Sequence, residues 1–343
     1  MKEKKTIYDV ARDAGVSIAT VSRVINGKGY VSEDTRRRVE EACEDYHPLA
    51  SAREIQSRKS NTIGIITNHQ TDYFFMNETF LNALRAIAEV TKNRGYRLMF
   101  EITNEKEEVC NLYHEQKVDG MIILGGNRGG ELIATLEEKE IPFVLVGDCK
   151  ELATVSQVEI NDRQAVCEAV RYLIGLGHRK IGIITGSLQY ASGINRLEGY
   201  REALAEAGIP IREEYIECCD GMTDVKVENL TKKLLYLPDR ITALVAFNDM
   251  VAVSAYKAAK EIGIEVGKDL SVIGFDDDRI ASYITPPLTT IWQPSYEKGE
   301  RAARILLDAL EEKRLPRERE ELKCIMIYRD SCVDIRQEKQ EKR

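Results

Sequence analysis

The first sixty residues carry apolar side chains at helical spacing, in three short stretches. Gly15 ends the first predicted helix, and Ser17 and Ser32 stand where they can cap a second and a third. The inward-facing positions of the three helices are Val10, Ala11, Ala14, Val21, Val24, Ile25, Val39 and Ala42. Three short helices with a tight glycine turn predict a helix-turn-helix unit.

From Asn61 onward, short apolar runs alternate with longer helical patterns, which is typical of a parallel sheet with crossover helices. One series of predicted strands covers residues 62–67, 97–102, 120–124 and 143–146. A second series covers residues 180–185, 241–247, 270–275 and 288–292, and the predicted helices include residues 80–93 and 165–176. Two series dividing near residue 160 predict two open, doubly wound α/β lobes whose strand ends face a shared ligand crevice.

Composition and charge narrow the choice of partners. The 343 residues are 43% apolar and 31% charged, enough for two or three folded units, and no apolar run approaches the roughly 20 residues that span a bilayer. With a charged start instead of a secretion signal, the chain is expected to be cytoplasmic, without a membrane partner. Residues 1–60 carry 12 Lys and Arg against 10 Asp and Glu, a balance of +2 that leaves −10 elsewhere, so any DNA contact must be local.

Eight cysteines show no metal-ligand spacing, and reduced thiols without a metal or cofactor are expected. The neighbours Cys218 and Cys219 keep a redox sensor open as an alternative.

One face of the second helix is suited to a DNA major groove. Its small apolar side chains match thymine methyl groups, and its polar side chains match base edges and phosphates. The residues of this face are Ser17, Ile18, Ala19, Ser22, Arg23 and Asn26. The alternative is a generic three-helix bundle with a surface isoleucine.

Three motifs in this region, TIYDVA (6–11), AGVS (14–17) and TVSRVIN (20–26), resemble the lactose and galactose repressor family of bacterial transcription regulators. The resemblance implies a dimer on palindromic DNA and a recognition helix within residues 17–26 that includes Thr20. Ile18 and Ala19 would discriminate sequence most strongly, while Tyr8 and Ser32 would lie near the phosphate backbone.

Residues 46–55, YHPLASAREI, resemble the hinge helix of that family. The resemblance implies that Ala52 and Ile55 contact DNA, with Ile55 where the family wedges a leucine into the minor groove. Leu49 departs from the usual capping Asn or Ser, and the preceding segment is two residues short. The alternative for Ile55 is a linker side chain that packs on the core.

Five further motifs extend the resemblance over the core: GLGHRKI (175–181), NRLEGY (195–200), FND (247–249), SVIGFDD (271–277) and PLTTI (287–291). The family core resembles type I periplasmic sugar-binding proteins. It implies a head at 1–47, a hinge and linker at 48–60, and an effector-binding and dimerisation core at 61–343. Lobe 1 would cover about 61–160 plus 291–323, and lobe 2 about 161–290 plus 324–340.

By the same resemblance, polar and aromatic side chains at the strand ends would hold a small effector. The implied hydrogen-bonding residues are Arg196, Asn248, Asp276, Ser192 and Asp148, and the implied stacking residues are Tyr73, Phe74 and Trp292. These favour a sugar or sugar phosphate over a nucleobase. The alternatives are an interlobe salt bridge between Asp276 and Arg196, and a core position for Phe74 or Trp292.

Two rival functions fit less well. An enzyme would need a phosphate loop at GGNRGG (125–130), but Asn127 stands where a dinucleotide fingerprint needs glycine, and neither a hydrolase elbow nor a zinc-protease motif occurs. Asp276, Asp277 and Asp278 could otherwise bind a metal. A sugar-transport protein would lack the DNA-binding head. We therefore expect a homodimeric repressor, without catalysis, whose operator affinity depends on a small effector.

Overall fold

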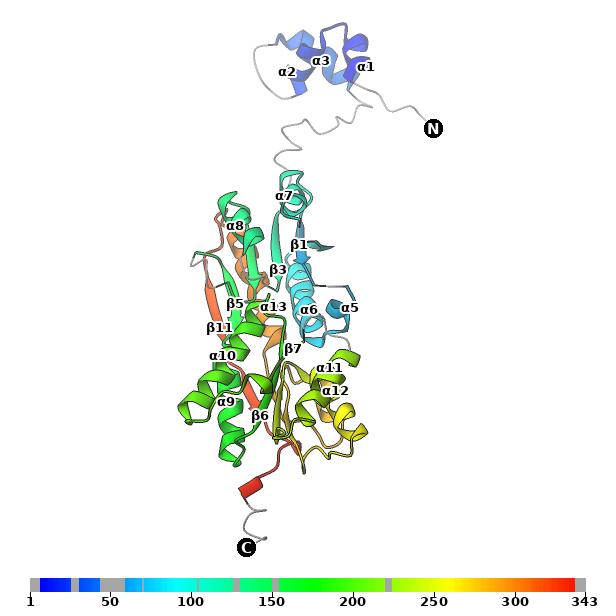
Figure 1. Cartoon of the computed structure of the whole chain (residues 1–343). Coiled ribbons are helices and arrows are strands. Elements are labelled where there is room, and N and C mark those ends of the chain that lie inside the picture. Colours follow the sequence, from blue (N-terminus) through cyan, green and yellow to red (C-terminus); the bar gives the residue numbers. More distant parts are fainter. Residues whose placement is uncertain are drawn as a thin grey trace. The chain divides into compact units, whose positions relative to one another are not determined.

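The computed structural model describes residues 7–25, 31–43, 59–69, 71–103, 105–125, 130–149, 154–219 and 224–336. They belong to two compact units, Met1–Lys59 and Ser60–Arg343. The first unit holds α1 (Ile7–Ala14), α2 (Ile18–Ile25) and α3 (Glu33–Ala42), at the positions that the apolar spacing predicts. The second unit contains two lobes, each built on a parallel sheet (Figure 1).

The first lobe is built on six parallel strands in the order β11-β5-β4-β3-β1-β2. Four of them have the predicted bounds: β1 (Thr62–Thr67), β2 (Arg97–Ile102), β3 (Gly120–Leu124) and β4 (Phe143–Val146). The other two are β5 (Gln157–Ile160) and β11 (Arg319–Leu322). Both are short and rich in polar residues, which explains why apolar runs do not reveal them. The helices are α5 (Thr71–Met76), α6 (Glu78–Asn93), α7 (Lys106–His114), α8 (Glu131–Glu138) and α13 (Ser295–Glu311).

Alternate residues of these strands face opposite layers of helices. Ile63 and Ile65 of β1 pack in one core with α6 and α13, while Ile66 packs in another with α7 and α8. A sheet covered on both faces needs apolar side chains on both sides of each central strand. That requirement produces the continuous apolar runs from which β1 and β3 are predicted.

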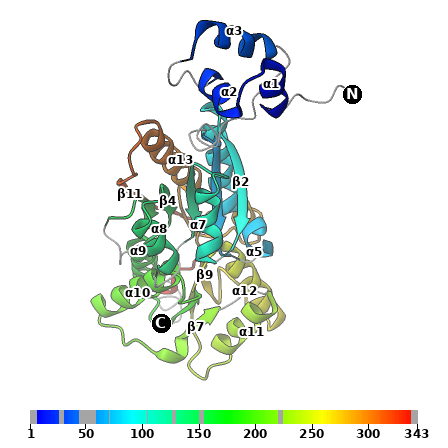
Figure 2. The same ribbon diagram turned by 90° about the horizontal axis from the view of Figure 1, so that it is seen from above.

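The second lobe repeats this plan with four parallel strands in the order β7-β6-β8-β9. The strands are β6 (Ile181–Gly186), β7 (Ile216–Cys219), β8 (Ala243–Ala246) and β9 (Ser271–Ile273). The helices are α9 (Asp162–Gly175), α10 (Ala191–Glu206), α11 (Asp224–Leu235) and α12 (Asp249–Glu261), with short 3-10 turns η1 (Glu213–Tyr215) and η2 (Arg279–Ser282). The pairs α9–α10 and α11–α12 cover opposite faces of the sheet (Figures 1 and 2).

One predicted strand does not join the second lobe's sheet as expected. Within residues 288–292, β10 (Thr290–Trp292) pairs antiparallel with β12 (Ile325–Ile327) in a separate two-stranded sheet. Isolated bridges join this segment to the region of β9, including one between Asp276 and Trp292, and Ile291 packs with Ile273 and Phe275 in one core. The chain passes between the lobes along β10 and β12, and again between β5 and α9.

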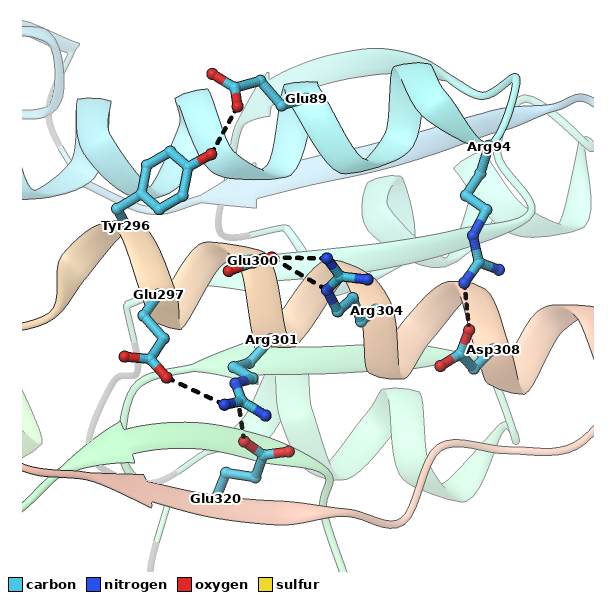
Figure 3. A network of polar contacts seen from close by, with 9 residues as sticks. All are labelled: Glu89, Arg94, Tyr296, Glu297, Glu300, Arg301, Arg304, Asp308 and Glu320. Atoms are coloured by element: carbon cyan, nitrogen blue, oxygen red, sulfur yellow. Dashed lines mark hydrogen bonds and ion pairs between the residues drawn. The ribbon is translucent and has the colours of Figure 1, made fainter.

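Helices α6 and α13 of the first lobe pack closely against each other. A Cβ added to Gly299 would lie 2.2 Å from the carbonyl oxygen of Ala83, so only glycine permits this approach. A polar network covers the outer surface of the pair (Figure 3). Its contacts include the hydrogen bond from Tyr296 Oη to Glu89 Oε2 at 2.6 Å and the Arg304–Glu300 ion pair. Because these groups are exposed, each ion pair stabilises the fold by only about 0–1 kcal/mol.

Candidate functional site

The helices of the head share a small apolar core. Val10, Val21 and Val39, one from each helix, are fully buried. Gly15 has a φ of +62°, a left-handed conformation that ends α1 and turns the chain toward α2. The Ser17 hydroxyl accepts a hydrogen bond from the Thr20 amide at 3.2 Å and so caps α2. The predicted helix-turn-helix is confirmed.

Most of the predicted DNA-reading residues are accessible. The side chain of Ile18, at the start of α2, is 40% exposed although it is apolar. Ser17, Ala19 and Arg23 are exposed beside it. The remaining positions of the prediction differ in their accessibility. Thr20 and Ser22 are half-buried, Tyr8 is 70% exposed on α1, and Ser32 is exposed with its hydroxyl capping α3 through the Thr35 amide. Asn26, Ala52 and Ile55 lie outside the described residues.

In the core, Arg196 of α10 is buried at the carboxyl ends of the second lobe's strands. Its Nε donates to Asp162 Oδ1 at 2.7 Å, and its Nη1 donates to the carbonyl oxygen of Phe247. The guanidinium also lies over the rings of Phe247 and Phe275, with Cζ 4.5 and 3.5 Å from their centroids. Burial of this cation is compensated by the carboxylate and the two ring faces.

Two further predicted residues follow the neighbouring strands. Asn248, just after β8, is buried, and its Oδ1 caps α12 by accepting from the Val251 amide at 3.0 Å. Asp276, after β9, is buried with a φ of +107°, and its Oδ1 accepts from Gln293 Nε2. Ser192 is half-buried in the first turn of α10. These positions lie at one edge of the sheet, as the order of the strands requires.

Asp148 brings the first lobe to this site. It follows β4, is buried, and its Oδ2 accepts a hydrogen bond from Asn195 Nδ2 of α10 at 2.8 Å. His69, after β1, stacks on Tyr190, which precedes α10, with ring centroids 4.7 Å apart and 26° between the planes. Burial lowers the pKa of His69 to about 4, so the imidazole in this stack is neutral near pH 7.

The predicted aromatic contacts have different surroundings. Phe74 is fully buried in the first lobe's core, where its ring centroid lies 5.1 Å from that of Phe80, so the core alternative describes its position. Trp292 is 36% exposed in β10, so it is not a core residue. Tyr73 belongs to α5, but its side chain lies outside the described part of the structure.

Three carboxyl groups near the end of β9 have raised pKa values. Burial, reinforced by the neighbouring carboxylates Asp276 and Asp278, raises the pKa of Asp249 well above its ordinary value. Burial also raises the pKa of Asp276, and burial next to Asp276 raises the pKa of Asp278 to about 8. Protonated carboxyls donate hydrogen bonds and ionised ones only accept, so this edge of the sheet can match both hydroxyl donors and hydroxyl acceptors.

Several important residues are absent from the sequence prediction. They are His69, Asp162, Tyr190, Asn195, Gln293 and Lys298. Asn195 is the first residue of the NRLEGY motif and Gln293 lies two residues after the PLTTI motif, so a close reading of those motifs would include them. No local pattern marks His69, because its ring partner Tyr190 is distant in sequence, and Lys298 resembles the other charged residues of its helix although its partner Gln293 is only five positions away.

The structure gives limited support to the alternatives of a metal site, a redox sensor and a phosphate loop. Among the described residues, the group that could hold a metal is Cys167, Glu202 and Glu206, but Arg163 and Arg171 already pair with its two carboxylates. Cys110, Cys167, Cys324 and Cys332 are free thiols, and Cys218 Sγ donates a hydrogen bond to the carbonyl oxygen of Gly186 at 3.3 Å. Residues 126–129 of the glycine-rich loop lie outside the described residues. None of the described helices has the length and apolar character needed to cross a membrane.

Two family descriptions match the chain. Residues 6–48 match "Bacterial regulatory proteins, lacI family", and residues 170–332 match "Periplasmic binding protein-like domain". Among solved structures, the transcriptional regulator CelR in complex with cellobiose superimposes with a TM-score of 0.74 at 28% identity, over 95% of this chain and 99% of that one. The lac repressor dimer bound to operator and an anti-inducer gives a TM-score of 0.70 at 27% identity, over 96% and 99%.

Curated relatives agree with this assignment. Catabolite control protein A of Priestia megaterium is 33% identical over 88% of this chain and 91% of its own length. The transcriptional repressor PurR of Photobacterium profundum is 32% identical over 96% and 99%. Similarity on this scale covers both the head and the core. The chain therefore belongs to the lacI family of bacterial regulatory proteins and is a DNA-binding transcription regulator, not an enzyme.

Proposed function

We propose that this cytoplasmic regulator represses transcription as a homodimer on a pseudo-palindromic operator, and that a sugar or sugar derivative bound between the two core lobes controls its affinity for DNA. The observation that supports this most directly is the contact between Asp148 of the first lobe and Asn195 of the second, one residue before Arg196. A ligand at this point would touch both lobes. Its binding free energy could then shift the equilibrium between two lobe arrangements.

The chemistry of the site favours a polyhydroxylated effector. Arg196 donates, Asp148 and Asp276 accept, and Asn248 and Ser192 can do both. Trp292 is partly exposed beside Asp276 and offers a ring face to the C–H face of a sugar. Similar regulators point the same way, since the CelR structure contains cellobiose and a lacI-family regulator from Enterococcus faecium contains ribose.

The head would read each half-site in the major groove. The exposed Ile18 and Ala19 would contact base edges, together with Ser17, Thr20, Ser22 and Arg23 and, by the resemblance, Asn26. Tyr8 and Ser32 would contact the phosphate backbone. We propose that Ile55 of the hinge enters the minor groove at the operator centre and that Ala52 contacts the DNA.

The test of the effector is a thermal-shift screen of the full chain against neutral sugars, sugar phosphates and nucleobases. A ligand at about 100 times its Kd stabilises the folded state by about 2.7 kcal/mol. We expect a sugar to shift the unfolding temperature of the wild type and of the surface control Arg171→Ala, but not of Asp276→Asn. A shift caused only by nucleobases would contradict the sugar assignment, and no shift in any class would contradict the effector site.

The test of DNA binding is selection of operators from random duplexes with the full chain. We expect two-fold symmetric sequences bound by two copies, with affinity that falls in Arg23→Ala and changes when the identified sugar is added. Because linkage is reciprocal, the operator should change the affinity for the sugar by the same factor. Selected sequences without two-fold symmetry would contradict the homodimeric arrangement.

A further inference from the structure

Helix α13 carries a buried lysine. The inward face of this helix is otherwise built from small and apolar residues, including Ala302, Ala303 and Leu306, which are fully buried. Lys298 lies on the same face and is only 9% exposed. A buried ammonium group loses its hydration and persists only when a specific partner compensates for the loss.

Gln293 is the partner of this lysine. Lys298 Nζ donates to Gln293 Oε1 at 2.5 Å, and Gln293 Nε2 donates in turn to Asp276 Oδ1 at 2.5 Å. Gln293 is 4% exposed and follows β10 directly, in the segment that crosses from the second lobe to the first. The three side chains form a continuous chain of hydrogen bonds from α13 of the first lobe to the strand end of the second.

The direction of this chain follows from the chemistry of its members. An ammonium group can only donate hydrogen bonds and a carboxylate can only accept them, whereas an amide has one end of each kind. Lys298 therefore holds the Gln293 oxygen toward itself, and the Gln293 NH₂ group must face Asp276. Without Lys298, the Gln293 oxygen loses its donor, and the amide could present its oxygen to Asp276 only if that carboxyl group were protonated and donated to it.

The charges around Asp276 make the ionisation of its carboxyl group depend on Lys298. The groups that act on Asp276 and Lys298 come from every neighbouring element: Asp162 of α9, Arg196 of α10, Asp249 of α12, Asp278 before η2, and Cys324 before β12. Burial raises the pKa of Asp276, and the positive charges of Arg196 and Lys298 oppose this rise. Burial lowers the pKa of Lys298, and Asp162 and Asp276 oppose that fall, so the charges of Lys298 and Asp276 stabilise each other.

We propose that Gln293 and Lys298 are positioning residues that hold the Asp276 carboxyl group in a fixed orientation for the effector. This inference rests on the proposed role of Asp276 in effector binding. The second Asp276 oxygen is then presented as a fixed acceptor for a hydroxyl or N–H group. An effector that displaces the Asp276 side chain also displaces Gln293, because the two are hydrogen-bonded. The displacement then reaches the crossing segment and α13 of the first lobe.

The test uses the full chain labelled with [ε-¹⁵N]glutamine and needs neither effector nor DNA. The Gln293 side-chain signal is assigned by its loss in Gln293→Leu. In the wild type we expect slow hydrogen exchange of this amide and a pH-dependent shift as Asp276 titrates, which Asp276→Asn abolishes. In Lys298→Met the midpoint should rise by about one pH unit or more, because an opposite charge close to a carboxylate lowers its pKa by 1–3 units.

Two variants serve as controls. Arg304→Met removes an exposed cation from the same helix and should leave the midpoint unchanged, and Lys298→Arg, which keeps the charge, should stay close to the wild type. The proposal is wrong if Lys298→Met titrates like the wild type. It is equally wrong if the wild-type amide exchanges as fast as the exposed Gln164, a result that stands even if Lys298→Met does not fold. Either failure can be distinguished from a failure of the effector screen, because the screen measures effector binding and this test measures the exchange and titration of the Gln293 side-chain amide.

Discussion

Asn195 of the second lobe donates a hydrogen bond to Asp148 of the first, with 2.8 Å between Nδ2 and Oδ2. Two other contacts join the lobes nearby: the stack of His69 on Tyr190, and the hydrogen bond from the Arg279 amide to Glu78 Oε2 at 2.9 Å. The lobes thus already touch through side chains beside the proposed effector site. An effector would have to bind to these side chains or replace their contacts. Replacing interlobe contacts with contacts to the effector can change the arrangement of the lobes.

The Asn195–Asp148 contact leads to a first prediction. Asn195→Ala should lower the free energy of unfolding by about 1–3 kcal/mol, because the buried Asp148 carboxylate loses a donor. Small-angle scattering should also show a larger radius of gyration if the contact holds the lobes together. Gln164→Ala removes a similar but exposed bond to Glu168 and should cost less than about 0.5 kcal/mol. Equal effects of the two variants would argue against a role for the interlobe bond.

Glu159 on β5 predicts a pH dependence of stability. Burial, together with the Asp148 carboxylate, raises the pKa of Glu159 from 4.5 to about 7. Between these pH values the folded chain binds this proton more often than the unfolded chain, so this group makes the free energy of unfolding fall as the pH rises. Glu159→Gln should remove that loss, which amounts to at most about 3 kcal/mol.

The measurement is the difference in unfolding free energy between Glu159→Gln and the wild type from pH 4.5 to 7.5. A difference is needed because His69 acts in the opposite direction: its lowered pKa of about 4 makes stability fall as the pH drops from 6.5. The difference should grow with pH and level off above 7. A flat difference would show that Glu159 is not perturbed.

Glycines at two helix positions should respond in opposite ways to the same substitution. Gly299→Ala places a Cβ 2.2 Å from the Ala83 carbonyl oxygen and should destabilise the α6–α13 pair by about 1–3 kcal/mol. Gly175→Ala, at the end of α9, meets nothing within 4 Å and should be neutral or stabilising. Chemical denaturation of both variants tests this. A Gly299→Ala protein as stable as the wild type would mean that the helices do not pack this closely.

The exposed Ile18 predicts a change of sequence preference without a change of stability. Ile18→Ala should alter the base preferred at one position of each selected half-site, while hydrogen exchange in α1 and α3 stays unchanged, because the side chain contributes little to the head's core. The buried Val21 is the comparison, since Val21→Ala should loosen the whole head. A uniform loss of affinity for all sequences in Ile18→Ala would reject its role in base recognition.

Much of the architecture could be predicted from the sequence because its signals are local. The caps at Ser17 and Ser32 and the apolar spacing around Val21 determine short helices, and unbroken apolar runs determine the central strands β1 and β3. These features depend on residues a few positions apart. The recognition face is equally local, since a helix with a known buried stripe leaves only one face for DNA.

The arrangement of the core site depended on the tertiary structure. The family resemblance implied that Arg196 and Asp276 belong to the effector site, but only the folded chain brings Asp162 to the guanidinium and Gln293 to the carboxylate. It also buries Phe74 in the core and directs β10 to β12 instead of the second sheet. The physical reason is that burial and pairing depend on groups far apart along the chain, whose approach is determined by the packing of whole sheets and helices.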